Sequence, residues 1–572
     1  MKLPRRAAQL APFLVLIAAL ALAHVEIFRA GAAEFAPLAR EGTEISIRAI
    51  SVADVTFEAW LVARHARTLW THPWDLLDTE HCAPERHTIT YGVPMIALGV
   101  LGMPAALFSR EPVFIYNAAL VAWSSVAALC MYVLVHGWTG RRAAGLAAAL
   151  LFAFHPIRLA NVIHPAEWDI AWTALALFFA ERLFARGRWR DAIGLGAAGA
   201  MQVAASFYTL VAASLLALPL GLWLLLRRAP RLATLAQLAV AVAIVAIAAA
   251  IVLGPYLAAR HEDRILERTF VAYAEWKYYA PGAVLYLGVP LMLGALAGLL
   301  APQRLALTRV AGEPRPALLA GALLVAFVAA GPDTAAVLQG LHLPVPAFDP
   351  WAALARVVPG LDTVRGVGRL GTAVHLVACV LAGAGLAAAI ALAGRYGHAV
   401  SAAGVAVAIF ACFGFPWPAP LGWQLEPVRP AQATIDFFTS LEERGNTGPM
   451  LELPIDFGAD DWTYPGPRRI LLSFWHGRRT SACFGSFFRP PTRDEVVVHA
   501  SALPAQAAID ALREMGFTTL VMHHEIPQMK AMTERKYARA IGREGGLRLV
   551  YQSEFASAWE ILPAPVAGAG ER

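Results

Sequence analysis

Ser51-Val-Ala-Asp54-Val-Thr-Phe-Glu58-Ala-Trp60 lies in a polar interval, residues 40–94, between two apolar segments. Further acids and several histidines follow it up to residue 87. The other connections between apolar segments are mostly short and basic. A long connection that carries carboxylates and histidines is therefore where we expect chemistry. Asp54 is the residue on which this expectation rests.

The composition indicates a polytopic membrane protein. The chain has 572 residues, of which 58% are hydrophobic and only 15% charged, and its mean hydropathy is +0.55. An ordinary soluble domain is less apolar. The net charge of +6 comes from short basic clusters between apolar runs. Such clusters report membrane topology, so no nucleic-acid partner is expected.

Several classes of function have no support in the sequence. It contains no C-x-x-C pair, no phosphate-binding Gly-rich loop, no G-x-S-x-G and no H-E-x-x-H motif. ATP-driven transport is therefore not indicated within this chain.

Apolar periodicity predicts eleven membrane-spanning helices, most of them near the roughly 20 residues that a bilayer requires. The segment at 91–108 contains two prolines and is predicted to be a re-entrant or interfacial helix, not a span. The positive-inside rule places the N-terminus in the cytoplasm and the C-terminus outside. The predicted spans are about 7–28, 113–136, 143–154, 169–185, 191–206, 208–226, 232–254, 283–300, 317–331, 371–394 and 398–415.

Four connections fall on the side opposite the basic clusters, and they hold most of the acids, histidines and tryptophans before residue 416. We expect them to converge on a single extracytoplasmic site. These outer loops are residues 29–94, 155–169, 260–281 and 331–369.

The composition changes after residue 415. Residues 416–429 form a proline-rich linker, and residues 430–572 are predicted to be a soluble α/β domain outside the cytoplasm. Its expected elements are strands at 450–454 and 517–523, a helix at 505–515, and a hairpin made by 547–553 and 559–562. The fold class is thus an all-α polytopic membrane bundle, residues 1–415, with a C-terminal soluble α/β domain.

Motifs in a characteristic order resemble a known family. They are Asp54 in the first outer loop, the Pro84-Glu-Arg turn, Phe152-Ala-Phe-His155-Pro-Ile-Arg158-Leu-Ala-Asn-Val-Ile-His164, Gln202 with Tyr208, and Pro359-Gly-Leu-Asp-Thr-Val-Arg365-Gly-Val-Gly-Arg369. Over most of residues 1–415 the chain resembles bacterial YfhO-like membrane proteins of the GT-C glycosyltransferase superfamily.

The resemblance implies a GT-C bundle in the bacterial inner membrane, with a role in the cell envelope. It also implies a polyprenyl-phosphate-linked sugar donor and an extracytoplasmic glycan, lipid or protein acceptor. An acidic residue of the first outer loop activates the acceptor in such enzymes. Asp54 follows Ala53 where many relatives have Gly, and Val93 stands where several have an acid. The resemblance therefore supports the fold more than the reaction.

Asp54 has two interpretations. As a carboxylate it can be the general base that takes a proton from the acceptor hydroxyl. Alternatively, Ser51 caps a helix and Asp54 lies in its first turn, where the helix dipole favours an acid. Both can hold together. Glu58, one turn later, is a supporting residue.

The second outer loop carries His155, Arg158, His164 and Glu167. Arg158 and His164 are candidates for binding a phosphate or a sugar hydroxyl, and His155 and Glu167 for supporting them. Polar residues at helix ends in the membrane interface are the alternative. A divalent metal held by His164, Glu167 and Asp54 is a further alternative, although no metal site is predicted.

Arg365 and Arg369 lie one helical turn apart, on the side where arginines are unusual. Arginine matches phosphate oxygens bidentately, so these two are candidate phosphate ligands. Internal pairing with a carboxylate such as Asp362 is the alternative.

Two cysteines, Cys82 and Cys483, are predicted outside the membrane. A disulfide between them would tether the soluble domain over the site, and two free thiols are the alternative.

Two functions follow from the sequence. The first is a membrane glycosyltransferase with Asp54 as base and Arg365 and Arg369, with Arg158, holding the donor phosphate. The second is a non-catalytic envelope-assembly protein or a lipid or glycan transporter on the same bundle. Charges in mid-span would favour an ion-coupled transporter, and the predicted spans carry almost none.

Overall fold

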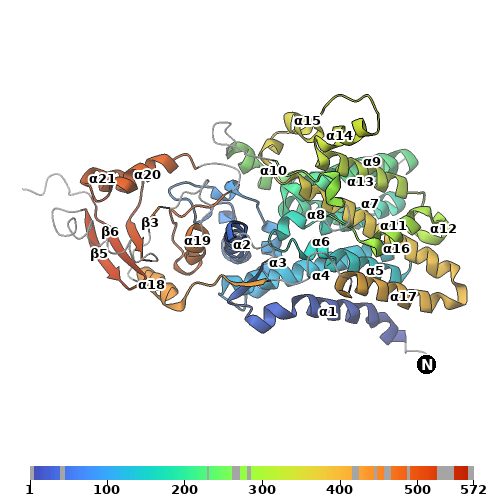
Figure 1. Cartoon of the computed structure of the whole chain (residues 1–572), viewed down its shortest axis with the longest axis horizontal. Coiled ribbons are helices and arrows are strands. Elements are labelled where there is room, and N and C mark those ends of the chain that lie inside the picture. Colours follow the sequence, from blue (N-terminus) through green and yellow to red (C-terminus); the bar gives the residue numbers. More distant parts are fainter. Residues whose placement is uncertain are drawn as a thin grey trace, which may run out of the picture.

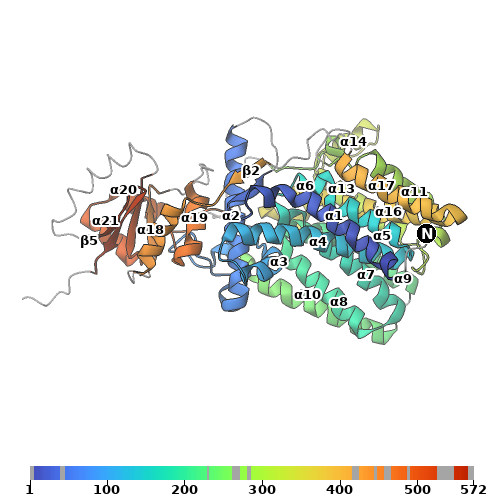
Figure 2. The ribbon, with the colours of Figure 1, turned by 90° about the horizontal axis from the view of Figure 1, so that it is seen from below.

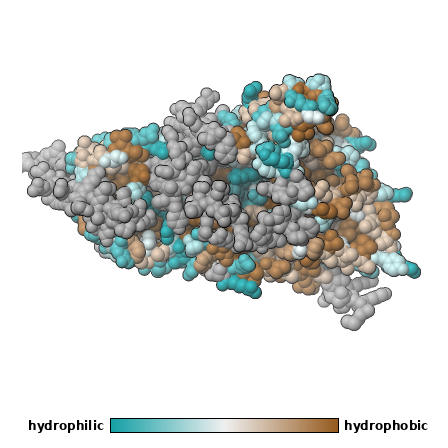
Figure 3. Space-filling view, viewed as in Figure 1, coloured by the Kyte–Doolittle hydropathy of each residue, from teal (hydrophilic) through white to brown (hydrophobic). Residues whose placement is uncertain are grey.

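The computed structural model of the chain is elongated, with a helical bundle at one end and a small sheet domain at the other (Figure 1). Apolar side chains dominate the surface at the bundle end (Figure 3). The predicted fold class, a membrane bundle with a C-terminal α/β domain, is confirmed. The structure describes the chain except for residues 1–4, 39–44, 229–230, 260–270, 280–284, 415–423, 444–447, 456–464, 486–489, 525–545 and 564–572.

Every predicted span contains a helix. Seven helices of the described chain are long and apolar enough to cross a membrane, or eight if α13 and α14, bent by 107° at a short break, form one span. Helices α7, α8 and α11 are not among them, and α13 counts only together with α14, so the count of eleven spans stays a prediction. The bundle helices are α1 (Arg5–Ala30), α4 (Pro112–Thr139), α5 (Arg142–Phe154), α7 (Ala171–Arg186), α8 (Trp189–Ala205), α9 (Phe207–Arg228), α10 (Leu232–Ala259), α11 (Val289–Leu300), α13 (Arg315–Ala330), α14 (Asp333–Gly340), α16 (Thr372–Leu392) and α17 (Gly397–Ile409).

Helix α2 (Ile45–Thr71) lies across the end of the bundle, between the membrane helices and the sheet domain (Figure 2). Because α2 begins at Ile45, Ser51 cannot be its N-cap, and Asp54 lies more than two turns inside it. The helix-cap interpretation of these two residues was therefore wrong. The predicted re-entrant segment forms α3 (Ile96–Ala106), whose 11 residues are too few to cross a bilayer.

The sheet domain has the strand order β3-β4-β6-β5, with β3 parallel to β4 and the other pairs antiparallel. The predicted strands and hairpin are confirmed as β3 (Met450–Leu453), β4 (Thr519–His523), β5 (Leu547–Gln552) and β6 (Ala556–Ile561), and the predicted helix as α21 (Gln506–Glu514). Helices α18 (Gln432–Glu443), α19 (Pro465–His476) and α20 (Arg493–Ala502) were not predicted.

Contacts far apart in sequence hold this domain to the rest of the chain. Trp60 of α2 donates its indole N–H to Ser473 Oγ of α19 at 2.9 Å. Strand β1 (Phe35–Leu38) pairs antiparallel with β2 (Gln424–Pro427), which directly precedes the domain. Arg429 forms an ion pair with Glu111 at the start of α4, with Nε and Oε2 2.9 Å apart. The domain is therefore docked on α2 and not merely linked to the last helix.

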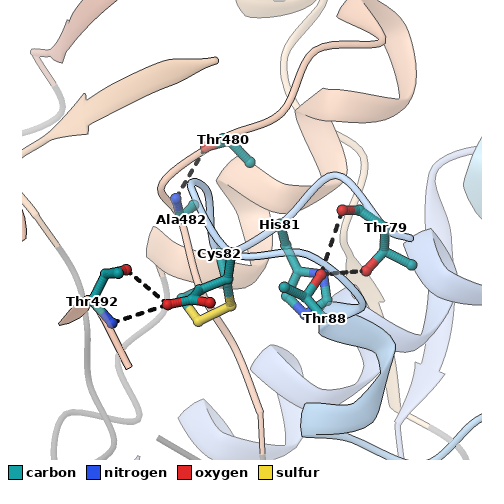
Figure 4. Close-up of a disulfide and its surroundings, with 9 residues drawn as sticks. Thr79, His81, Cys82, Thr88, Thr480, Ala482 and Thr492 are labelled. Atoms are coloured by element: carbon teal, nitrogen blue, oxygen red, sulfur yellow. Dashed lines mark hydrogen bonds between the residues drawn. A yellow bond between two sulfur atoms is a disulfide. The ribbon is translucent and has the colours of Figure 1, made fainter. Parts of the chain in front are cut away.

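A disulfide joins Cys82 of the first long loop to Cys483 of the sheet domain (Figure 4). The tether considered in the sequence analysis is thus present. Around it, Cys82 N donates to Ala482 O at 2.9 Å and Ala83 N to Thr480 O at 2.8 Å. The Thr492 N–H and hydroxyl both donate to Glu85 Oε1 at 2.9 Å. The loop and the domain therefore share one hydrogen-bonded seam.

Removing this disulfide is expected to destabilise the docked domain. The two cysteines are 401 residues apart in the chain. The Cys82→Ser, Cys483→Ser double variant should lose about 2–4 kcal/mol of unfolding free energy, the typical contribution of a disulfide. Denaturant unfolding in detergent would measure this. Alkylation of the unfolded, unreduced parent should label only Cys130, Cys379 and Cys412. Labelling of all five cysteines would contradict the assignment.

Candidate functional site

The four predicted outer loops do converge. His164 of the second loop faces α2 of the first, and Glu167 pairs with Arg369 of the fourth. The third and fourth loops exchange backbone hydrogen bonds, from Ala272 N to Arg365 O at 2.9 Å and from Gly368 N to Ala272 O at 2.8 Å. One polar cluster therefore forms at the end of the bundle that α2 covers.

Two carboxylates of α2 point into this cluster. Asp54 and Glu58 are four residues apart and so share one helix face. His164 lies between them, with Nδ1 3.4 Å from Glu58 Oε1 and Nε2 3.8 Å from Asp54 Oδ2. Tyr116 of α4 donates its hydroxyl to Glu58 Oε2 at 3.2 Å. Glu58 is buried at 3% exposure, whereas the Asp54 side chain keeps 18% of its surface accessible. Asp54 is therefore the carboxylate that a substrate can reach.

A buried ion pair forms the other half of the cluster. Glu167, in the short 3-10 helix Pro165–Trp168, pairs with Arg369 of the segment Val367–Gly371. The Arg369 guanidinium also lies over the Tyr208 ring, 5.2 Å from its centroid. Of the sequence alternatives for Arg369, internal pairing is present, but its partner is Glu167. The side chain of Arg369 keeps 27% of its surface accessible, which leaves room for a further anion.

Burial changes the protonation of the groups around Asp54. The pKa of Glu58 is well above its usual value because the carboxyl is buried and because Asp54 and Glu167 add negative charge. The pKa of His164 is well below its usual value because of burial and the nearby Arg369. These surroundings favour the uncharged form of both groups. With Glu58 protonated, its Oε1 hydroxyl can donate to His164 Nδ1, which leaves the Nε2–H directed toward Asp54.

Two predicted residues lie apart from this cluster. Arg158 is buried with its guanidinium 3.5 Å from the centroid of the Trp123 ring, and it donates to Trp168 O at 3.1 Å. His155 accepts from Ile157 N and has Nε2 3.1 Å from Leu287 O. Both side chains occupy helix ends in contact with aromatic rings or backbone. The geometry gives them a packing role and does not direct them at Asp54.

An apolar groove of about 380 Å³ runs between α9 and α10. Its walls include Val211 and Leu218 of α9 and Leu253 and Leu257 of α10, and its end is formed by residues 358–364. The next residue is Arg365, which interacts electrostatically with Tyr208. Neither arginine is among the residues that line the groove, but the lining residues Phe207 and Val364 adjoin Tyr208 and Arg365 in the chain, and Tyr208 lies against Arg369.

Sequence reasoning missed two tyrosines that shape the site. Tyr116 bonds Glu58, and Tyr256 of α10 donates its hydroxyl to Ile89 O and Gly92 O at 3.0 and 2.9 Å. Both lie within long apolar helices, where an isolated tyrosine is usually an interfacial residue. Two acids spaced four residues apart, such as Asp54 and Glu58, were a stronger sequence signal than either tyrosine.

Within the described residues, no three His, Cys, Asp or Glu side chains are arranged to hold a metal ion. Asp54, Glu58, His164 and Glu167 are neighbours, but Arg369 occupies the position beside Glu167.

No family model and no curated protein matches the chain. Solved structures that match nearly all of it include glycosyltransferases. Against the arabinofuranosyltransferase AftD from Mycobacteria the TM-score is 0.48 at 16% identity, covering 98% of this chain and 40% of AftD. Against ArnT from Cupriavidus metallidurans the TM-score is 0.44 at 11% identity, covering 97% of this chain and 98% of ArnT. Against the Archaeoglobus fulgidus oligosaccharyltransferase the TM-score is 0.43 at 13% identity, covering 96% of this chain and 74% of that enzyme.

The chain thus spans less than half the length of AftD. At these scores and identities the likeness assigns no substrate and no catalytic residue to this chain. What the cluster can do follows from its own geometry. It presents one accessible carboxylate, Glu58 and His164 beside it, and Arg369 next to Tyr208, whose neighbour Phe207 lines an apolar groove.

Proposed function

We propose that the protein is an integral membrane glycosyltransferase that moves a sugar from a polyprenyl-phosphate donor to an extracytoplasmic acceptor. The observation that carries the proposal is the arrangement of the groove. The lining of an apolar groove includes Phe207 and Val364, which adjoin Tyr208 and Arg365 in the chain, and Tyr208 lies against Arg369 of the cluster in which Asp54 is the accessible carboxylate. This is the order of parts that an apolar tail, a phosphate and a transferred sugar require.

The donor fits by the chemistry of its two ends. The apolar walls around Val211 and Leu257 match an isoprenoid chain in polarity. A phosphate at the end of the groove would meet the guanidinium groups of Arg365 and Arg369, which suit its oxygens. Tyr208 lies against Arg369 and helps to hold that guanidinium in place.

Asp54 acts as the general base in this proposal. The acceptor oxygen attacks the anomeric carbon, the bond between that carbon and the phosphate oxygen breaks, and the phosphate leaves with the electron pair. Asp54 accepts the proton of the acceptor hydroxyl as the new bond forms. His164 is a positioning residue, because its Nε2 faces Asp54 at 3.8 Å.

Blocking the groove should test the donor class. In Val211→Trp the indole would fill the groove, and we expect at least tenfold weaker binding of polyprenyl phosphate and a matching loss of transfer. Val407→Trp on α17, whose side chain is 51% exposed elsewhere on the bundle, is the matched control and should bind as the parent does. If Val211→Trp binds polyprenyl phosphate as tightly as the control, the groove does not hold the donor. A parent protein that binds the lipid but transfers no sugar would favour the transporter alternative.

A further inference from the structure

A second cavity, of about 580 Å³, lies where the first long loop meets the end of α10 and the sheet domain. The loop provides Trp74, Asp78, Glu85 and Arg86, and Pro491 comes from the sheet domain. Nothing in the proposed donor site uses this cavity. Its volume is within the range of cavities that bind small ligands.

Trp74 is the most conspicuous side chain of the cavity. It lies in the 3-10 helix Pro73–Asp75 and has 94% of its surface exposed. Exposing a large aromatic ring to water is unfavourable, and tryptophan is enriched at interfaces, where its ring is covered by a partner. A flat apolar ring with no protein covering it suits the apolar face of a sugar ring.

Hydrogen bonds hold two carboxylates of the cavity in place. Glu85 Oε1 accepts two hydrogen bonds from Thr492, and Asp78 Oδ1 accepts one from His87 N at 3.1 Å. Glu85 Oε2 has no hydrogen-bond partner among the described residues. Arg86 is exposed and forms neither a hydrogen bond nor an ion pair with them. The cavity thus offers an oriented acceptor and an unengaged donor beside the Trp74 ring.

The loop that carries these groups has a strained backbone. Cys82 and His87 both have a positive φ angle, of 60° and 55°, which residues other than glycine rarely adopt. Such conformations persist where the surrounding structure imposes them, and they are common at binding sites. Here Cys82 is bonded to Cys483, and His87 N donates to Asp78 Oδ1. The loop is therefore built to hold one shape, which reduces the entropy lost on binding.

The last turns of α10 separate this cavity from the apolar groove. Gly254, Pro255 and Ala258 line the cavity, whereas Leu253 and Leu257 line the groove. Tyr256, on the groove side, bonds the backbone at Ile89 and Gly92, next to the cavity-lining Thr90 and Tyr91. A ligand in the cavity and a lipid in the groove would therefore lie on opposite sides of one helix.

We propose that the cavity binds a saccharide portion of the acceptor, with one sugar ring stacked on Trp74. Sugar hydroxyls donate to Glu85 Oε2 and accept from the Arg86 guanidinium. The inference rests on the proposed function, because it takes the acceptor to be a glycan and not a lipid or a protein. Saccharide binding at this cavity does not itself require turnover.

Binding is tested on the full-length protein in detergent, with a printed array of defined oligosaccharides of two to six residues as the probe. The Asp54→Asn variant is used beside the parent, so that no probe is altered during the measurement. We expect both to retain the same oligosaccharides. For a retained oligosaccharide, Trp74→Ala should weaken binding at least tenfold, and Arg86→Ala about fivefold.

The matched control is Trp189→Ala, an equally large change at a tryptophan that is 55% exposed on α8 and outside the cavity. It should leave binding unchanged. Retention of no oligosaccharide, or equal retention by Trp74→Ala and the control, overturns the saccharide cavity. If saccharide binding depends on Trp74 but no sugar is transferred, the cavity stands and the proposed glycosyltransferase activity falls. If Trp74→Ala transfers sugar to a glycan acceptor with unchanged KM, the saccharide cavity is overturned and the proposed glycosyltransferase activity stands.

Discussion

Asp54→Asn is expected to lower glycosyl transfer about 100-fold or more while the protein stays folded and binds donor as before. General-base catalysis typically contributes factors of 10²–10⁴, and asparagine has nearly the same shape but cannot accept the proton. The carboxylate to be replaced is the accessible one of the pair on α2. Transfer from a polyprenyl-phosphate sugar to acceptor, measured with melting temperature on the same preparation, tests the prediction.

Glu58→Gln is the matched comparison. Burial and neighbouring carboxylates raise the pKa of Glu58 well above its usual value, which favours the uncharged form of the native side chain. A neutral amide in its place should therefore cost much less activity than Asp54→Asn. Equal losses in the two variants would mean that the carboxylates act as a unit. An active Asp54→Asn protein would remove Asp54 from the mechanism.

Arg369→Ala is expected to impair the protein in two ways. Its partner Glu167 has a side chain only 8% exposed, and a buried carboxylate left without its cation costs about 3 kcal/mol of unfolding free energy. Loss of a charge-assisted bond to phosphate should also weaken polyprenyl-phosphate binding tenfold or more. Denaturant unfolding and lipid binding measure the two effects separately.

The double variant Arg369→Ala, Glu167→Gln separates these roles. The neutral amide no longer leaves a buried charge, so most of the lost stability should return. Lipid binding should stay weak, because the guanidinium is still missing. Recovery of both properties would show that Arg369 supports the structure only through Glu167 and is not a phosphate ligand.

The sequence was sufficient for the bundle and for the grouping of the loops. Long apolar runs and basic clusters are strong, local signals, so all eleven predicted segments contain a helix. The hairpin of β5 and β6 was equally legible from its alternating pattern. Helix α19 was not, because its amphipathic face is matched to α2, some 400 residues earlier, and no local pattern reports such a partner.

The site was only partly predictable. Asp54, His164, Glu167 and Arg369 were identified by residue type and loop, and they lie together. Arg158 was identified by the same reasoning but packs on Trp123, because a sequence does not show which way a side chain leaves a short helix. The start of α2 was misplaced by about two turns, because a serine followed three residues later by an acid resembles a helix cap even inside a helix. The partner of Arg369 depended on a loop-to-loop contact and not on sequence proximity.

The seam between Cys82 and Cys483 also sets an order of events in biosynthesis. Ribosomes make the first loop early, but its covalent partner appears only after 401 further residues. The same delay applies to strand β1, whose neighbour β2 follows the last bundle helix. During synthesis the carboxylates of α2 therefore exist before the domain that docks on α2. Chains that end before residue 483 would carry every residue of the polar cluster, yet they would lack the covalent anchor that holds the loop with Trp74 in shape.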